Sequence, residues 1–212
     1  MMKYPLLWIM LINILWLPNL NAEPQAPPIK PTMLVIGDSL SSAYNMPSSK
    51  GWVALLEQQL TEKNYPYTVI NRSYSGDTTA IGRARLPKLL AEYQPELVIL
   101  ALGGNDGLRG LPISQIEANL TEMIEQVQDY AAKLLLVGIY LPPNYGPSYV
   151  QQFQALYPKL SEAYDVPLIP FLLEGVALDT TLMMKDGIHP KEIAQPIILQ
   201  TVWPYLCPLL EK

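Results

Sequence analysis

The stretch Met33-Leu-Val-Ile-Gly-Asp-Ser-Leu-Ser41 constrains the fold of this chain more than any other. Its first four residues are all apolar and predict a short strand that is buried on both faces, as in a parallel sheet. Gly37 ends the strand, and Asp38 and Ser39 follow as residues typical of a helix start. Two interpretations stay open at this point. In the first, Ser39 is a nucleophile at the carboxyl edge of a sheet, beside free backbone N–H groups. In the second, Asp38 and Ser39 only cap a helix.

Short apolar runs alternate with stretches of helical spacing along the rest of the chain. Further strands are predicted at 67–70, 97–102, 134–139 and 166–169, and helices at 51–63, 80–93, 115–130, 149–164 and from 191 until Pro204 bends or ends the last one. This alternation predicts an α/β fold with a parallel central sheet. Ligands of such sheets bind outside the carboxyl ends of the strands. One site is therefore expected where four loops meet, which begin at Gly37, Asn71, Gly103 and Leu141.

The N-terminal residues differ in character from the rest. Lys3 precedes an apolar run over 4–16, and Asn21-Ala22 provides small residues for cleavage. This order predicts a secretory signal peptide over residues 1–22, removed during export to the periplasm or the outside of the cell. An uncleaved anchor is the alternative, although the run is short for a membrane span. A proline-rich lead-in over 23–31 and a single domain over 32–212 complete the predicted organisation.

Composition excludes several classes of partner. The net charge is -5 and no basic run occurs, which disfavours binding to nucleic acid. Cys207 is the only cysteine, so no disulfide can form within the chain. One histidine without a cysteine cluster cannot supply the usual ligands of a metal site. We therefore expect no metal. We also expect no organic cofactor, no membrane span after signal cleavage, and a monomer.

His189 is the only histidine and lies three residues after Asp186. A bend through Gly187 would bring the Asp186 carboxylate onto one ring nitrogen and leave the other nitrogen free to face Ser39. These three side chains would then be the nucleophile, the base and the orienting acid of a serine hydrolase. The alternative is a surface loop that carries an incidental histidine.

The glycine-rich segment Gly103-Gly104-Asn105-Asp106 is a candidate for binding an oxyanion. Glycines allow close approach of the backbone, and the Asn105 amide is a donor for developing negative charge. The backbone N–H of Gly76 is a second candidate donor, while a plain turn after a strand is the alternative for the segment. Asp38 is expected to cap or orient the loop backbone rather than to take part in catalysis. The α/β-hydrolase fold is disfavoured because its Gly-x-Ser-x-Gly elbow does not match residues 37–41.

Four short blocks occur in order along the chain, namely Gly37-Asp-Ser-Leu40, Gly76, Gly103-Gly-Asn-Asp106 and Asp186-Gly-Ile-His189. They resemble the motif blocks of the SGNH (GDSL) hydrolase family, and the resemblance extends from about Met33 to the final helix.

Four longer motifs extend this resemblance. They are Ser39-Leu-Ser-x-x-Tyr44, Ser75-Gly-Asp-Thr78, Gly104-Asn-Asp-Gly-Leu-Arg-Gly110 and Leu141-Pro-x-Asn-Tyr-Gly146. These motifs resemble one branch of the family, the periplasmic thioesterases, lysophospholipases and arylesterases.

The resemblance implies a three-layer α/β/α fold with about five parallel strands in a flavodoxin-like order. It implies Ser39 as the nucleophile, His189 as the general base and Asp186 as the partner of the histidine. It also implies an oxyanion hole built from the backbone N–H groups of Ser39 and Gly76 and the side chain of Asn105.

The family further implies a mobile loop over 107–112 that settles on acyl chains, with Tyr140–Pro147 as the opposite wall. Pro112 departs from the family pattern and is expected to stiffen this loop. The implied substrates are acyl esters and thioesters, including lysophospholipids, fatty acyl esters and aryl esters. A carbohydrate acetyl esterase and a non-enzymatic acyl-binding protein are the alternatives. The expected substrate-binding residues, whose leucines favour lipid-like acyl groups, are Gly107, Leu108, Arg109, Gly110, Leu111, Leu141 and Tyr145.

Overall fold

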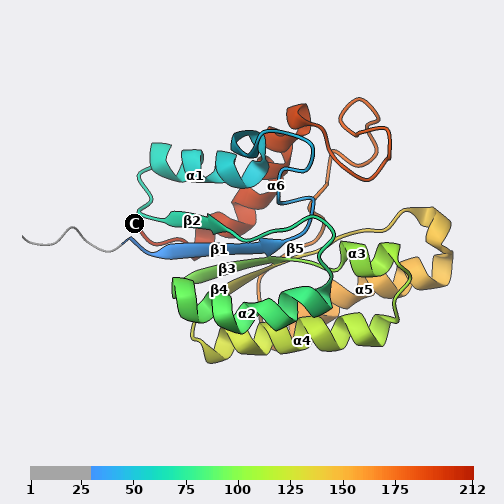
Figure 1. Ribbon diagram of the computed structural model, residues 1–212, viewed down its shortest axis with the longest axis horizontal. Coiled ribbons are helices and arrows are strands. Elements are labelled where there is room, and N and C mark those ends of the chain that lie inside the picture. The colour runs from blue at the N-terminus through green and yellow to red at the C-terminus, as the bar shows by residue number, and fades with distance from the viewer. Residues whose placement is uncertain (1–29) are drawn as a thin grey trace, which may run out of the picture.

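Five parallel strands form one sheet in the order β2-β1-β3-β4-β5 (Figure 1). The computed structural model describes residues 30–212, so the predicted signal peptide and most of the lead-in over 23–31 lie outside the described residues. The strand order is the flavodoxin-like one, which confirms the expected parallel sheet and its topology. The strands are β1 (Thr32–Gly37), β2 (Thr68–Asn71), β3 (Leu97–Ala101), β4 (Lys133–Val137) and β5 (Leu168–Ile169).

Helices cover both faces of the sheet and make three layers, as predicted (Figure 1). One face carries α1 (Trp52–Glu62) and α6 (Gln195–Leu206). The other face carries α2 (Thr79–Tyr93), α4 (Ile113–Asp129) and α5 (Pro147–Tyr164). The short helix α3 (Gly104–Leu108) follows β3 directly. Four 3-10 turns complete the elements, namely η1 (Ser48–Lys50), η2 (Pro143–Tyr145), η3 (Glu192–Ala194) and η4 (Cys207–Leu209).

The apolar run of β1 explains why this strand lies in the middle of the molecule. Met33 and Val35 belong to the core cluster beneath α1 and α6, while Leu34 and Ile36 belong to the cluster beneath α2, α4 and α5. All four side chains have no exposed surface. Successive strand residues point to opposite faces, so burial on both faces requires an unbroken apolar run.

The predicted helix start at Asp38 and Ser39 is wrong, because the chain forms a series of turns there. The N–H groups of Ser41 and Ser42 both bond to the carbonyl oxygen of Asp38, at 3.1 and 3.0 Å. Ala43 and Asn45 then adopt left-handed backbone angles, with φ of 59° and 55°, which a right-handed helix does not accommodate. The first α-helix begins only at residue 52.

The C-terminal helix and the segment after β3 also differ from the prediction. The last helix begins at Gln195, because the 3-10 turn η3 occupies the residues before it. It runs to Leu206, two residues past Pro204, since a proline so close to the end disturbs little of the helix. The glycine-rich segment after β3, expected as a loop, forms α3. Within residues 30–212 no helix is both long and apolar enough to cross a membrane.

Candidate active site

The loops after β1, β2, β3 and β4 meet at the carboxyl edge of the sheet (Figure 1). The Oγ atoms of Ser42 and Ser75 lie 3.0 Å apart, which joins the first loop to the second. The Asn105 amide donates to the carbonyl oxygen of Asp77 at 2.9 Å, which joins the third loop to the second. Leu141, from the fourth loop, lines the same cavity as Asn105. The chain changes direction across the sheet between β2 and β3, and such switch points leave a crevice for a ligand.

Ser39, His189 and Asp186 form a continuous hydrogen-bonded line. His189 Nε2 lies 2.8 Å from Ser39 Oγ, and His189 Nδ1 lies 2.8 Å from Asp186 Oδ2. His189 lies in a loop whose two ends are joined by a hydrogen bond. The Met184 N–H donates to the His189 carbonyl oxygen at 2.7 Å. Gly187 makes the bend with a φ of 67°, a conformation that glycine adopts without strain.

The Asp186 carboxylate accepts from three donors. The backbone N–H groups of Ile188 and His189 bond to Oδ1 at 2.9 and 3.0 Å, while the imidazole bonds to Oδ2. Partial burial alone would raise the pKa of Asp186, but the hydrogen bonds from the His189 backbone, the His189 ring and Ile188 outweigh it and lower the pKa to about 2. Asp186 is therefore ionised at neutral pH. It favours the tautomer with the proton on Nδ1, which leaves the lone pair of Nε2 facing Ser39.

The pKa of Asp38 is shifted in the opposite direction from that of Asp186. It is 2% exposed, and its Oδ1 accepts one backbone N–H, from Leu40 at 3.0 Å. Burial raises the pKa of Asp38 to about 6, although the Leu40 N–H and the nearby His189 act in the opposite direction. The contact with Leu40 fixes the turn that carries Ser39. This geometry agrees with a role in orienting the loop backbone.

The three expected oxyanion donors are the N–H groups of Ser39 and Gly76 and the Asn105 amide, and Asn105 lines the same cavity as Ser39. Within residues 30–212, neither the Ser39 N–H nor the Gly76 N–H has a hydrogen-bond acceptor. Gly76 has a φ of 86°, and its carbonyl oxygen accepts from the Arg109 guanidinium at 3.0 Å. The Asn105 amide is held by the carbonyl oxygen of Asp77 at 2.9 Å and makes a longer contact of 3.3 Å with Asp38 Oδ2. Backbone N–H groups and amides of this kind can bind an oxygen that gains negative charge.

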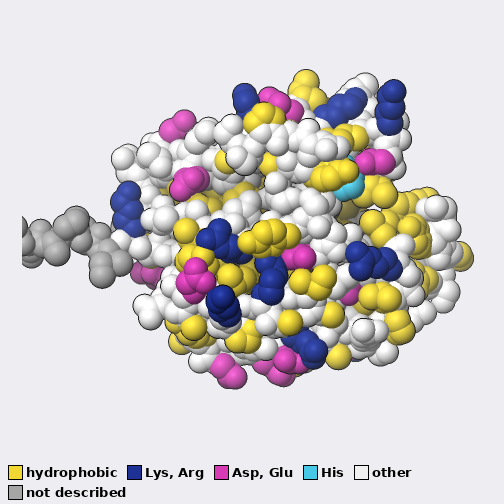
Figure 2. Space-filling model, viewed as in Figure 1, with side chains coloured by type: hydrophobic (Ala, Val, Ile, Leu, Met, Phe, Trp, Pro, Cys, Tyr) yellow, Lys and Arg dark blue, Asp and Glu magenta, His cyan; other side chains and the backbone are white. Residues whose placement is uncertain are grey.

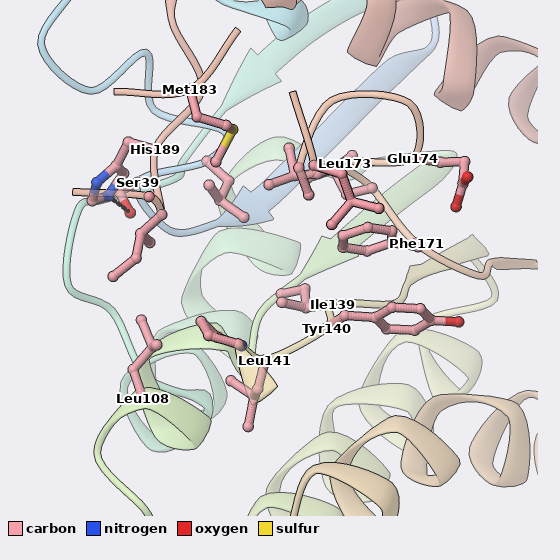
Figure 3. A pocket seen from close by; sticks show the side chains of 18 of the residues that line it. Ser39, Leu108, Ile139, Tyr140, Leu141, Phe171, Leu173, Glu174, Met183 and His189 are labelled. Atoms are coloured by element: carbon pink, nitrogen blue, oxygen red, sulfur yellow. Dashed lines mark hydrogen bonds between the residues drawn. The ribbon is translucent and has the colours of Figure 1, made fainter. Parts of the chain in front are cut away.

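A cavity of about 940 Å³ extends from Ser39 and His189 (Figure 3). The rings of Tyr140 and Phe171 stack in its wall, with centroids 4.4 Å apart and planes at 6°. Figure 3 shows the Glu174 carboxylate and the Tyr140 hydroxyl at the end of the cavity away from Ser39. In Figure 2 the histidine reaches the surface at the rim of a hollow flanked by hydrophobic side chains. The aliphatic lining consists of Leu40, Leu108, Ile139, Leu141, Leu172, Leu173, Ala177, Leu178, Ile188 and Met183.

Two of the seven predicted substrate-binding residues, Leu108 and Leu141, line this cavity. Gly107 lies behind the lining, where an added Cβ would come within 2.6 Å of Leu141, so its small size lets α3 approach the wall. The other four lie outside the lining. Arg109 contacts the Gly76 carbonyl oxygen, and the Leu111 carbonyl oxygen accepts from Tyr149 at 2.6 Å. Gly110 and Tyr145 lie in the turn before α4 and in η2.

The segment after β5 supplies much of the lining that the sequence did not predict. Phe171, Leu173 and Glu174 come from this segment, and so does Met183. A signal was available, because a strand was expected at 166–169 and the rule for the carboxyl ends of strands applies to it as well. Within residues 30–212 no cluster of three or more His, Cys, Asp or Glu side chains could hold a metal ion.

The fold has three layers, and a serine, a histidine and a carboxylate lie in line at the carboxyl edge of its sheet. This combination is typical of a serine hydrolase. The GDSL-like Lipase/Acylhydrolase family matches residues 35–195. The chain belongs to this family.

Individual relatives agree with this assignment. The chain is 51% identical over 179 residues to the esterase TesA of Pseudomonas aeruginosa, which covers 84% of this chain and 89% of the relative. It is 46% identical over 179 residues to the thioesterase 1/protease 1/lysophospholipase L1 of Escherichia coli, with 84% and 85% covered. The crystal structure of a psychrotrophic esterase EstA from Pseudoalteromonas, inhibited by monoethylphosphonate, superposes with a TM-score of 0.81 at 37% identity, covering 84% of this chain and 97% of that one.

Asp38→Asn tests the buried carboxyl. Because the folded state raises the pKa from 3.8 to about 6, it binds the proton more tightly than the unfolded chain. The contribution of this group to the free energy of unfolding is therefore lost as the pH rises from about 4 to 6, a loss of about 3 kcal/mol. Asparagine keeps the acceptor for the Leu40 N–H but does not titrate.

Urea unfolding of both proteins at pH 4 and pH 8 measures the effect. The stability of the variant relative to the natural chain should be higher at pH 8 than at pH 4, by about 3 kcal/mol. If the variant and the natural chain differ in free energy of unfolding by the same amount at both pH values, Asp38 does not titrate in this range.

Proposed function

We propose that this chain hydrolyses acyl esters and thioesters through an acyl-enzyme on Ser39, with His189 as general base and Asp186 as its partner. The observation that carries the proposal is the pair of 2.8 Å contacts from the two ring nitrogens of His189 to Ser39 Oγ and Asp186 Oδ2. Similarity to proteins named esterase and thioesterase supports both classes of substrate.

In the first half of the reaction, Ser39 Oγ attacks the carbonyl carbon while its proton passes to Nε2 of His189. The ionised Asp186 stabilises the imidazolium that forms. The bond to the leaving oxygen or sulfur then breaks, and the imidazolium protonates the leaving group. The acyl group remains on Ser39.

Water completes the reaction in the second half. His189 takes a proton from the water as it attacks the acyl carbonyl, and returns that proton to Ser39 Oγ as the acid is released. In both halves the carbonyl oxygen becomes negative and is bound by the N–H groups of Ser39 and Gly76 and by the Asn105 amide. The short bond of Asn105 to Asp77 orients the amide, and the oxyanion replaces its longer contact with Asp38.

The cavity supports substrates with an extended apolar acyl group. Its lining is mainly aliphatic and aromatic, and its volume of about 940 Å³ far exceeds what an acetyl group requires. The carbohydrate acetyl esterase is disfavoured for this reason. A non-enzymatic acyl-binding protein would leave the contacts among Ser39, His189 and Asp186 without a role.

We also propose that the protein acts as a monomer outside the cytoplasm. The charge and hydropathy pattern of residues 1–22 supports export with removal of a signal peptide. Thioesters of coenzyme A are scarce there, so lysophospholipids, fatty acyl esters and aryl esters are the proposed natural substrates. Nucleic acid is not a proposed partner.

Ser39→Ala tests the covalent route. Without the nucleophile, kcat for p-nitrophenyl butyrate should fall on the order of 10⁴- to 10⁶-fold, and labelling by a fluorophosphonate should disappear. The exposed Ser48 of η1 provides a matched control, and Ser48→Ala should keep full activity and labelling. Turnover near the natural rate in Ser39→Ala would reject the acyl-enzyme.

Asn105→Ala tests the oxyanion donors. Because the amide binds charge that develops only in the transition state, kcat should fall on the order of 10²- to 10³-fold with little change in KM. Steady-state kinetics on the same ester separates the two constants. Asn64→Ala, in the turn after α1 at the opposite edge of the sheet, should leave both unchanged. An unchanged kcat in Asn105→Ala would remove this residue from the oxyanion hole.

The length of the acyl chain distinguishes the proposed substrates from acetyl esters. Across p-nitrophenyl esters from acetate to laurate, kcat/KM should rise by roughly tenfold or more, because each additional CH₂ that is buried contributes about 0.8 kcal/mol until the cavity is filled. A maximum at acetate would favour the carbohydrate acetyl esterase instead.

A further inference from the structure

Tyr44 covers one face of the His189 ring. The two ring centroids lie 4.3 Å apart, with the planes tilted by 33°. Both nitrogens at the edges of the imidazole are already engaged, by Ser39 and by Asp186. The faces are what remains for another group to contact, and the histidine side chain is 18% exposed.

The backbone around Tyr44 is strained in a way that fixes this residue. Ala43 and Asn45, its two neighbours, adopt left-handed conformations with φ of 59° and 55°. An alanine in this region is unfavourable, and such strain persists only where the surrounding structure enforces it. The Met46 N–H bonds to the Ala43 carbonyl oxygen at 3.2 Å, and Ser42 Oγ lies 3.0 Å from Ser75 Oγ. The turn is therefore fastened on both sides of the tyrosine.

The ring of Tyr44 makes this contact, and its hydroxyl takes no part. Within residues 30–212 the hydroxyl oxygen has no hydrogen-bond partner, and the residue is 36% exposed. The side chain is partly buried, and the aromatic contact that its ring makes is with the imidazole of His189.

We infer that Tyr44 is a positioning residue for the general base. A ring whose face is covered cannot swing toward that side, so Tyr44 keeps His189 Nε2 directed at Ser39. The π face of Tyr44 also favours the imidazolium that forms when the serine proton is transferred, because aromatic faces attract cations. This inference rests on the proposed role of His189 as the base of an acyl transfer.

The test compares Tyr44→Leu and Tyr44→Phe. Leucine keeps bulk but loses the aromatic face, so kcat should fall about 5- to 30-fold with KM within about twofold. Phenylalanine keeps the face and should restore kcat to within about twofold of the natural value. The rates are measured on p-nitrophenyl butyrate and divided by the number of active sites that a fluorophosphonate labels at completion, so that unfolded molecules do not count.

Two further variants separate this inference from its alternatives. Tyr205 in α6 is 39% exposed, similar to Tyr44, and Tyr205→Leu should leave kcat unchanged. A natural kcat per labelled site in Tyr44→Leu would overturn the inference, as would a loss in Tyr44→Phe as large as that in Tyr44→Leu. Activity that survives in Ser39→Ala would instead overturn the proposed function.

Discussion

The hydrogen bond between Ser39 and His189 joins residues that are 150 positions apart, and the site depends on it. One end is held by β1, in which the side chains of residues 33–36 have no exposed surface. The other end is held by the loop before α6, in which Met183 pairs with Pro190. Met183 and Met33 of β1 belong to the same buried cluster. The packing that stabilises the sheet therefore also sets the distance between the Ser39 hydroxyl and the His189 imidazole.

Two aspartates near this bond, Asp186 and Asp38, have different pKa values because their surroundings differ. Asp186 has three hydrogen-bond donors and a side chain that is 41% exposed, and its pKa is about 2. Asp38 is buried with one backbone donor, and its pKa is about 6. Donors favour the charged carboxylate, whereas burial opposes it. Asp186 can therefore stabilise an imidazolium at neutral pH. Asp38 lowers the stability of the fold at that pH, while its contact with the Leu40 N–H fixes the turn.

The sequence predicted those parts of the molecule that a pattern or a rare residue marks. Unbroken apolar runs marked the strands, and a single histidine near an aspartate marked the line to Ser39. The turn after β1 was missed because alanine rarely adopts the left-handed angle that Ala43 has here. The wall at Phe171 and Leu173 was missed although a strand was predicted at 166–169, because apolar residues after a strand resemble ordinary core.

The distribution of backbone strain separates the scaffold from the site. Within residues 30–212, left-handed residues other than glycine fall into two groups. Four of them, Asn64, Gln94, Ala131 and Asp165, follow the ends of helices, where this conformation closes the last turn. Ala43 and Asn45 end no helix, and between them stands the ring that covers His189. The left-handed pair that ends no helix thus flanks the ring beside the imidazole, and backbone strain at such a position is typical of a functional site.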